Sequence, residues 1–140
     1  MQFEYKVEGG DFTNAGNASS EVKKILKKLN VSPKITRRVV VALYEAEVNI
    51  VAHAYRGDII VEIDTEKIRI QLNDEGPGID SIEQAMTEGF STASEQVREM
   101  GFGAGMGLPN INRNADELNI TSEIGKGTNL EIITYLNKEN

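Results

Sequence analysis

Three polar residues recur at helical spacing within a largely apolar segment. The stretch VVVALYEAEVNIVAHA at residues 39–54 is apolar enough to lie in a core, yet Glu45, Asn49 and His53 follow one another at intervals of four. In a helix this interval places the three side chains on one stripe. Because a buried carboxylate or amide without a partner is costly, the stripe could face a ligand or a metal ion. An ordinary solvent-facing side of an amphipathic helix is the alternative that the helix alone leaves open.

A second candidate element is the run NDEGPGI at residues 73–79, directly after a predicted strand. Asp74 is then a carboxylate at a strand end, and it can accept a hydrogen bond from an amino group such as that of adenine. The glycines that follow would let the backbone approach a flat ligand. A tight turn, in which Asp and Gly are common, explains the same residues.

A third candidate element is the glycine-rich run GFGAGMGL at residues 101–108, which leads into a predicted helix. Backbone N–H groups at the start of such a helix can bind phosphate. The run matches neither a Rossmann nor a Walker motif, because no strand enters it directly and no Lys-Ser/Thr pair follows Gly107. A flexible loop is the alternative, and bound phosphate would require a different nucleotide-binding fold.

The elements that must position these groups alternate along the chain. Period-two patterns predict a strand at residues 3–7 and a hairpin of strands at 59–63 and 68–72. Helical spacing predicts helices at 19–29, 81–87 and 107–114, and Ser32-Pro33 opens a long helix to about Ala54. Two further strands follow, near residues 118–120 and 130–135. We therefore expect residues 1–140 to form a single α+β domain, a two-layer sandwich of a mixed, mostly antiparallel sheet with helices on one face.

Composition restricts the classes of protein. The chain has 140 residues, a formal net charge of -7 and no Cys. The charge argues against direct binding to nucleic acid or an anionic membrane, and the missing Cys excludes a disulfide framework and a thiolate zinc site. The start, MQFEYKVEGG, has no apolar signal segment, so we expect a cytoplasmic protein.

The order of the motifs is more specific than any one of them. The patterns are E-x-x-x-N at residues 45–49, D-x-G-x-G at 74–78, G-x-G at 105–107 and G-x-G-T at 125–128. In this order they resemble the Bergerat-fold (GHKL) superfamily, which includes gyrase, heat-shock chaperones, histidine kinases and mismatch-repair proteins. The segments EAEVNIVAHAY and GMGLPNINRNADELNITSEIGKGT resemble the bacterial anti-sigma-factor and switch-type protein-serine kinases within it.

The resemblance implies a role for each matching residue. Asn49 would coordinate Mg²⁺ that bridges the phosphates of ATP, and Glu45 would be the general base. Asp74 would bind the adenine amino group, supported by Thr128. The other implied nucleotide-binding positions are Gly76, Gly78 and Ile79 in the loop after Asp74, and Gly105, Met106, Gly107 and Leu108 in the lid.

The resemblance also implies a function. We expect an ATP- and Mg²⁺-dependent protein-serine/threonine kinase that acts in partner switching, phosphorylates a STAS-domain antagonist protein and regulates transcription indirectly. A sigma factor or a phosphatase could be a second partner, and relatives suggest a homodimer. Two alternatives stay open: a non-catalytic nucleotide-binding anti-sigma factor that sequesters a sigma factor, and a detached histidine-kinase catalytic domain.

Several charged residues have no assigned role. His53 on a core helix is more often a structural hydrogen-bonding group than a catalyst, and Arg98 and Lys126 are the cations nearest to the expected phosphate loops. Between Val22 and Arg38 the chain carries seven Lys or Arg and no acidic residue. This basic run could attract an acidic partner protein, although such lysines are usually the solvated face of a helix.

Overall fold

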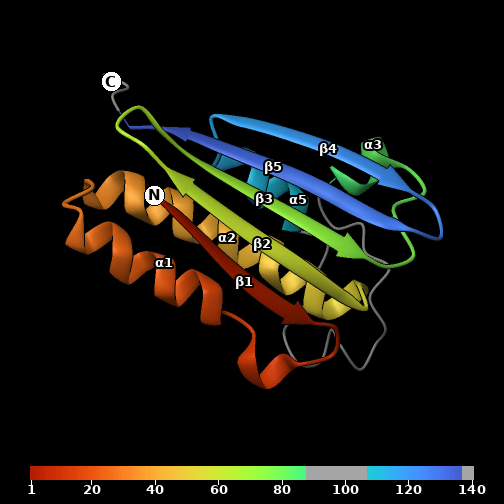
Figure 1. Cartoon of the computed structure of the whole chain (residues 1–140). Helices are drawn as coiled ribbons and strands as arrows, with labels where there is room; N and C mark the ends of the chain where they lie inside the picture. Colours follow the sequence, from red (N-terminus) through yellow and green to blue (C-terminus); the bar gives the residue numbers. More distant parts are fainter. Residues whose placement is uncertain (88–106, 137–140) are drawn as a thin grey trace.

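One antiparallel sheet with helices on one face forms the protein (Figure 1). The computed structural model describes residues 1–87 and 107–136. Its strands are β1 (Gln2–Glu8), β2 (Arg56–Ile63), β3 (Lys67–Glu75), β4 (Glu117–Glu123) and β5 (Gly127–Tyr135). They are arranged in the order β1-β2-β3-β5-β4, and each of the four pairings is antiparallel. The expected two-layer sandwich is confirmed, and the described strands contain no parallel pair of the kind that a mixed sheet would have.

The helices pack through apolar stripes that the sequence predicts. They are α1 (Asn17–Lys28), α2 (Pro33–His53), α3 (Ile82–Ala85) and α5 (Gly107–Arg113), with a short 3-10 helix at Phe12–Asn14. Val22 and Leu26 of α1 are fully buried. The Ser32 side chain accepts a hydrogen bond from the Ile35 N–H at 3.2 Å, so it caps α2 as expected. None of the described helices is long and apolar enough to cross a membrane.

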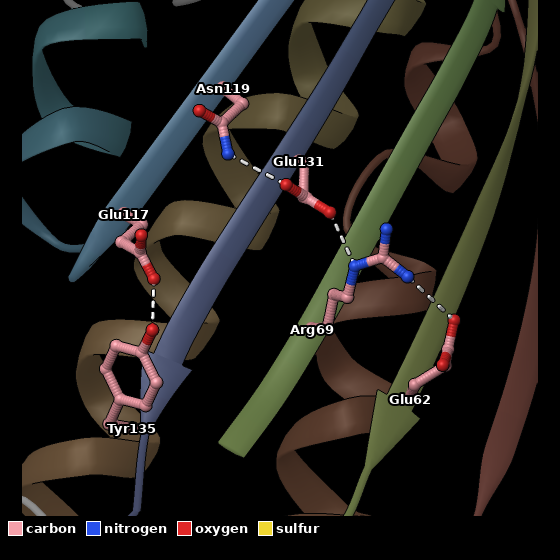
Figure 2. Close-up of polar contacts among 6 residues, drawn as sticks. All are labelled: Glu62, Arg69, Glu117, Asn119, Glu131 and Tyr135. Atoms are coloured by element: carbon pink, nitrogen blue, oxygen red, sulfur yellow. Dashed lines mark hydrogen bonds and ion pairs between the residues drawn. The ribbon is translucent and has the colours of Figure 1, made fainter.

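The two faces of the sheet differ in polarity, as the alternation along each strand requires. The core face carries buried side chains such as Ile59, Ile70 and Ile132. Polar side chains lie on the opposite face, where a chain of contacts crosses neighbouring strands (Figure 2). Its links are Glu62–Arg69 at 3.5 Å, Arg69–Glu131 at 2.5 Å and Asn119–Glu131 at 2.8 Å. The helices therefore cover only the apolar face, and the candidate site residues must lie at the margin between the two layers.

Most predicted elements form close to their expected positions. The hairpin of β2 and β3 pairs Ile63 with Ile68 across its turn. The alternation predicts a strand that ends at residue 72, but β3 continues to Glu75, so Asp74 lies within the last residues of the strand. The antiparallel pairing of β3 with β2 accounts for this extension, because Asp74 stands opposite Gly57. The expected loop at residues 88–106 lies outside the described residues.

Candidate functional site

The polar stripe of α2 forms as predicted. Glu45, Asn49 and His53 are each half-buried, whereas Ala46 and Ile50 on the adjoining face are buried in the core. Burial lowers the pKa of His53, which favours the neutral imidazole. This polar stripe of α2 is thus kept partly open to solvent.

Glu45 contacts the second helix of the site. The Asn110 side chain of α5 donates a hydrogen bond to the Glu45 carboxylate, and the Asn110 Oδ1 atom accepts one from Arg113 at 2.6 Å. Burial raises the pKa of Glu45, and the hydrogen bond from Asn110 offsets part of that rise. A carboxylate with a raised pKa is a stronger base than an exposed glutamate. The sequence did not single out Asn110, although its place three residues after Gly107 puts it one helical turn into α5.

Asn49 packs against the first residue of α5. A Cβ atom built on Gly107 would lie 2.8 Å from Asn49 Oδ1 and 2.9 Å from Asn49 Nδ2. Any side chain at position 107 would therefore displace the amide. Glycine at the start of α5 lets the helix backbone approach Asn49 closely. The structure thus brings together two motifs that lie almost 60 residues apart in the sequence.

Asp74 belongs to a hydrogen-bonded chain that crosses three strands. Its Oδ1 atom accepts a hydrogen bond from the Thr128 N–H at 3.0 Å. The Thr128 hydroxyl lies 2.9 Å from the Ser122 hydroxyl, which accepts a hydrogen bond from the Ile79 N–H at 2.8 Å. Burial raises the pKa of Asp74, and the Thr128 N–H partly offsets the rise. The described residues offer no further partner to the Asp74 carboxylate, so its Oδ2 atom keeps its capacity to accept.

The loop after Asp74 is held by its own contacts with the protein. Gly76 donates a backbone hydrogen bond to the Lys126 carbonyl at 3.0 Å. Gly78 has a φ of +80°, and a Cβ atom there would lie 2.6 Å from the Glu123 carbonyl oxygen. The sequence suggested that these glycines admit a flat ligand. In the structure, Gly78 lets the loop pack closely against the end of β4, and Gly76 lets it pack against Ala54 at the end of α2.

Three of the remaining predicted residues lie within the described part of the chain, and three lie outside it. Thr128 and Leu108 are each 8 % exposed, and Leu108 belongs to the apolar core, so only its backbone is available to a ligand. Lys126 is exposed and forms an ion pair with Glu123 at 3.3 Å, which fits a solvated surface charge. Gly105, Met106 and Arg98 lie outside the described residues.

A buried carboxylate that sequence reasoning missed lies two residues beyond Glu45. Glu47 is 2 % exposed, and its two oxygens accept hydrogen bonds from the backbone N–H groups of Gly16, Ala18 and Ser19, each at 3.1 Å. These donors are the free N–H groups at the start of α1. Glu47 therefore caps one helix from the interior of another and fixes the two helices to each other.

The donor atoms near α2 fit a magnesium ion that arrives with nucleotide. Asn49 supplies an amide oxygen, a ligand type that Mg²⁺ accepts, and Mg²⁺ in phosphate-binding sites usually takes only one or two protein ligands besides phosphate and water. Across residues 1–87 and 107–136, no group of three or more His, Asp or Glu side chains forms a separate metal cage. The site thus suits an ion held jointly by protein and phosphate.

The antiparallel sheet, the helices on one face and the stripe of Glu45 and Asn49 together define a nucleotide-binding domain of the Bergerat class. The family model for the histidine kinase-like ATPase domain matches residues 11–134, and the chain belongs to that family. Membership implies that ATP is its nucleotide.

Named relatives include kinases and anti-sigma factors. The chain is 31 % identical over 118 residues to the serine/threonine-protein kinase RsbT of Bacillus subtilis, covering 81 % of this chain and 83 % of the relative. It is 37 % identical over 102 residues to an anti-sigma F factor of Caldanaerobacter subterraneus subsp. tengcongensis, covering 69 % and 68 %. The crystal structure of the RsbU and RsbW domains of Rv1364c from Mycobacterium tuberculosis matches with a TM-score of 0.66 at 13 % identity, over 97 % of this chain and 32 % of that one. This last likeness concerns the fold alone.

Proposed function

We propose that the chain is an ATP- and Mg²⁺-dependent protein-serine/threonine kinase of the partner-switching type, with a small STAS-domain protein as its substrate. One observation carries the proposal: Glu45 and Asn49 lie one turn apart on α2, and both contact α5. This arrangement offers a base and a metal ligand beside the start of one helix. The likeness to a relative named serine/threonine-protein kinase supports the same activity.

Asp74 and its hydrogen-bonded neighbours would hold the nucleotide base. The Thr128 N–H fixes Asp74 Oδ1, which leaves Oδ2 to accept a hydrogen bond from the adenine amino group. Ser122 links Thr128 to the backbone of Ile79, so the adenine site would be held rigidly by β3, β4 and β5. Gly76, Gly78 and Ile79 would form one wall of it, and Gly105, Met106, Gly107 and Leu108 would border the phosphates.

Phosphoryl transfer depends mainly on positioning and on neutralising charge. Mg²⁺, when bound with ATP, would neutralise phosphate charge, and Asn49 Oδ1 would be its protein ligand. The substrate hydroxyl oxygen forms a bond to the γ-phosphorus while the bond from that phosphorus to the bridging oxygen of ADP breaks. Glu45 takes the hydroxyl proton, and Asn110 holds the Glu45 carboxylate in position.

The proposal is tested by incubating the protein with radiolabelled ATP, Mg²⁺ and each STAS-domain protein encoded in the same genome. Glu45→Gln should lower the transfer rate about 10²–10⁴-fold, the usual contribution of a general base, and should keep ATP affinity. Asp74→Asn should instead weaken ATP binding, because the amide nitrogen cannot accept a hydrogen bond from adenine. Full kinase activity in Glu45→Gln would refute the assigned base.

A matched control separates these effects from a general loss of charge. Glu66 lies exposed in the β2–β3 turn, so Glu66→Gln makes the same chemical change away from the site. Its transfer rate and ATP affinity should equal those of the unmodified protein. Acid-stable labelled product would indicate phosphoserine or phosphothreonine, whereas an acid-labile product would indicate a histidine kinase domain.

A second candidate function is the holding of a sigma factor without catalysis. The likeness to proteins named anti-sigma F factor favours it. A stable complex with a sigma factor, combined with no transfer to any STAS-domain protein, would select this alternative.

A further inference from the structure

A groove of about 580 Å³ lies between the C-terminal half of α1 and the N-terminal half of α2. Lys23 and Lys27 line it from α1, and Arg37 lines it from α2. All three side chains belong to exposed residues, and none of them forms an ion pair or a side-chain hydrogen bond within the described part of the chain. No acidic residue lines the groove. Its rim is therefore a positive surface whose charge is not compensated by the protein itself.

The groove also has an apolar lining. Val31 in the turn between the helices and Val40 and Val41 of α2 contribute to it, and all three are half-buried. Half-buried aliphatic groups beside uncompensated cations match a segment that carries apolar side chains flanked by Asp or Glu. A small anionic ligand would use the cations alone and would leave the valines exposed.

The candidate base lies on α2 one turn beyond the last residue that lines the groove. Arg37, Val41 and Glu45 follow at intervals of four, so they lie on one stripe of the helix. Val41 lines the groove, and Glu45 lies one turn further along, about 6 Å by the helical rise. A chain bound in the groove would thus place its neighbouring residues beside Glu45.

We propose that this groove docks an acidic, amphipathic segment of the protein that receives the phosphoryl group. The inference rests on the proposed kinase function and names the surface by which the substrate is held. The acidic segment binds the Lys23, Lys27 and Arg37 rim, and its apolar side chains cover Val31, Val40 and Val41. Docking one turn from Glu45 raises the local concentration of the hydroxyl at the base.

Two double variants of α1 test the groove against general attraction by positive charge. Lys23→Glu/Lys27→Glu reverses two groove lysines, and Lys24→Glu/Lys28→Glu reverses two lysines of the same helix that do not line the groove. Both change the net charge equally, so long-range attraction falls by the same amount in each. The probe is the STAS-domain protein phosphorylated in the assay above.

The groove variant should raise the KM for the STAS-domain protein about tenfold or more, with kcat at saturation and ATP affinity unchanged. The control variant should stay within about twofold. Circular dichroism melts should show both variants folded, because all four lysines are exposed. A kcat effect in place of a KM effect would contradict docking.

Four other outcomes would overturn the inference. Equal KM values for the two variants would leave only non-specific attraction. A concentration-dependent dimer in analytical ultracentrifugation that is lost in Lys23→Glu/Lys27→Glu alone would make a second copy of this chain the occupant. If the unmodified protein phosphorylates no STAS-domain protein, the proposed function fails, and the inference fails with it. If transfer occurs and is unchanged in the groove variant, only the inference fails.

Discussion

Two glutamates of α2, Glu45 and Glu47, lie two residues apart in very different surroundings. Glu47 is 2 % exposed and accepts three backbone N–H hydrogen bonds. Glu45 is half-buried, and within the described residues its carboxylate accepts one side-chain hydrogen bond, from Asn110. Burial raises the pKa of Glu45. The more deeply buried carboxylate, Glu47, thus accepts more hydrogen bonds from the protein.

This difference separates a structural carboxylate, Glu47, from the carboxylate that we propose as the base, Glu45. Three backbone N–H donors use the acceptor capacity of the Glu47 carboxylate, so it has little left for a substrate. Glu45 keeps free acceptor capacity and an elevated basicity, which are the properties a proton acceptor needs. Burial alone would have pointed to Glu47 and not to Glu45, the base that we propose. The number and type of hydrogen-bond donors distinguishes the two.

The largest effect should come from Glu47→Ala. The change leaves three N–H groups at the start of α1 without their acceptor, and each buried unsatisfied donor costs about 1–3 kcal/mol. We expect a loss of about 3–5 kcal/mol in the free energy of unfolding, a large share of the about 5–15 kcal/mol typical of a domain. Urea denaturation followed by circular dichroism measures it.

Glu47→Gln supplies a second test if the alanine variant does not fold. The amide keeps one acceptor oxygen but presents an NH₂ group to the remaining donors, so the loss should be smaller but in the same direction. Glu45→Gln is the matched control, two residues away on the same helix. Equal destabilisation by Glu45→Gln and Glu47→Gln would remove the distinction between the two glutamates.

Much of the fold follows from local patterns that the sequence displays. Ser32-Pro33 starts α2 because the serine oxygen accepts an N–H and proline has none to leave unsatisfied. The alternation at residues 59–63 and 68–72 specifies the β2–β3 hairpin, since a one-residue shift would expose its apolar face. The exact end of β3 depends on its pairing with the start of β2, where Asp74 stands opposite Gly57, and the local pattern did not reveal it.

The site was only partly predictable, for a similar reason. The interval of four placed Glu45 and Asn49 together because both lie on one helix. The roles of Asn110, Ser122 and Glu47 depend on contacts between elements that are remote in sequence, such as the 28 to 31 residues that separate Glu47 from its N–H donors. Spacing within α2 could indicate that Glu45 and Glu47 point to different sides, but not which partners each would meet.

A smaller effect should come from Asn110→Ala, which removes the side-chain donor of Glu45. We expect the transfer rate to fall about tenfold, equivalent to about 1.4 kcal/mol, with ATP affinity unchanged. The hydrogen bond lowers the pKa of Glu45, so its loss raises that pKa further. Because the base must be ionised, the decline of the rate at acidic pH should begin at a higher pH than in the unmodified protein. Rates measured across a pH series test both points.

Asn112→Ala is the control for this change. Asn112 is exposed on the same helix, so the substitution alters α5 equally without touching Glu45. Its pH profile should superimpose on that of the unmodified protein. A rate loss in Asn110→Ala without a shifted profile would indicate a structural role for Asn110, and it would leave Glu45 without the positioning contact assigned to it.

The smallest effect should be a gain in stability from Glu45→Gln. Burial raises the pKa of Glu45 in the folded protein above its unfolded value, so the ionised carboxylate destabilises the fold at neutral pH. This cost is absent at a pH below the pKa that Glu45 has in the unfolded chain. It builds up as the pH rises through the pKa that Glu45 has in the folded protein. The variant should therefore be slightly more stable than the unmodified protein at pH 7 and equally stable in acid, while it loses phosphoryl transfer. Urea denaturation at pH 7 and at an acidic pH measures the gain. A loss of stability at pH 7 would mean that Glu45, like Glu47, serves the fold.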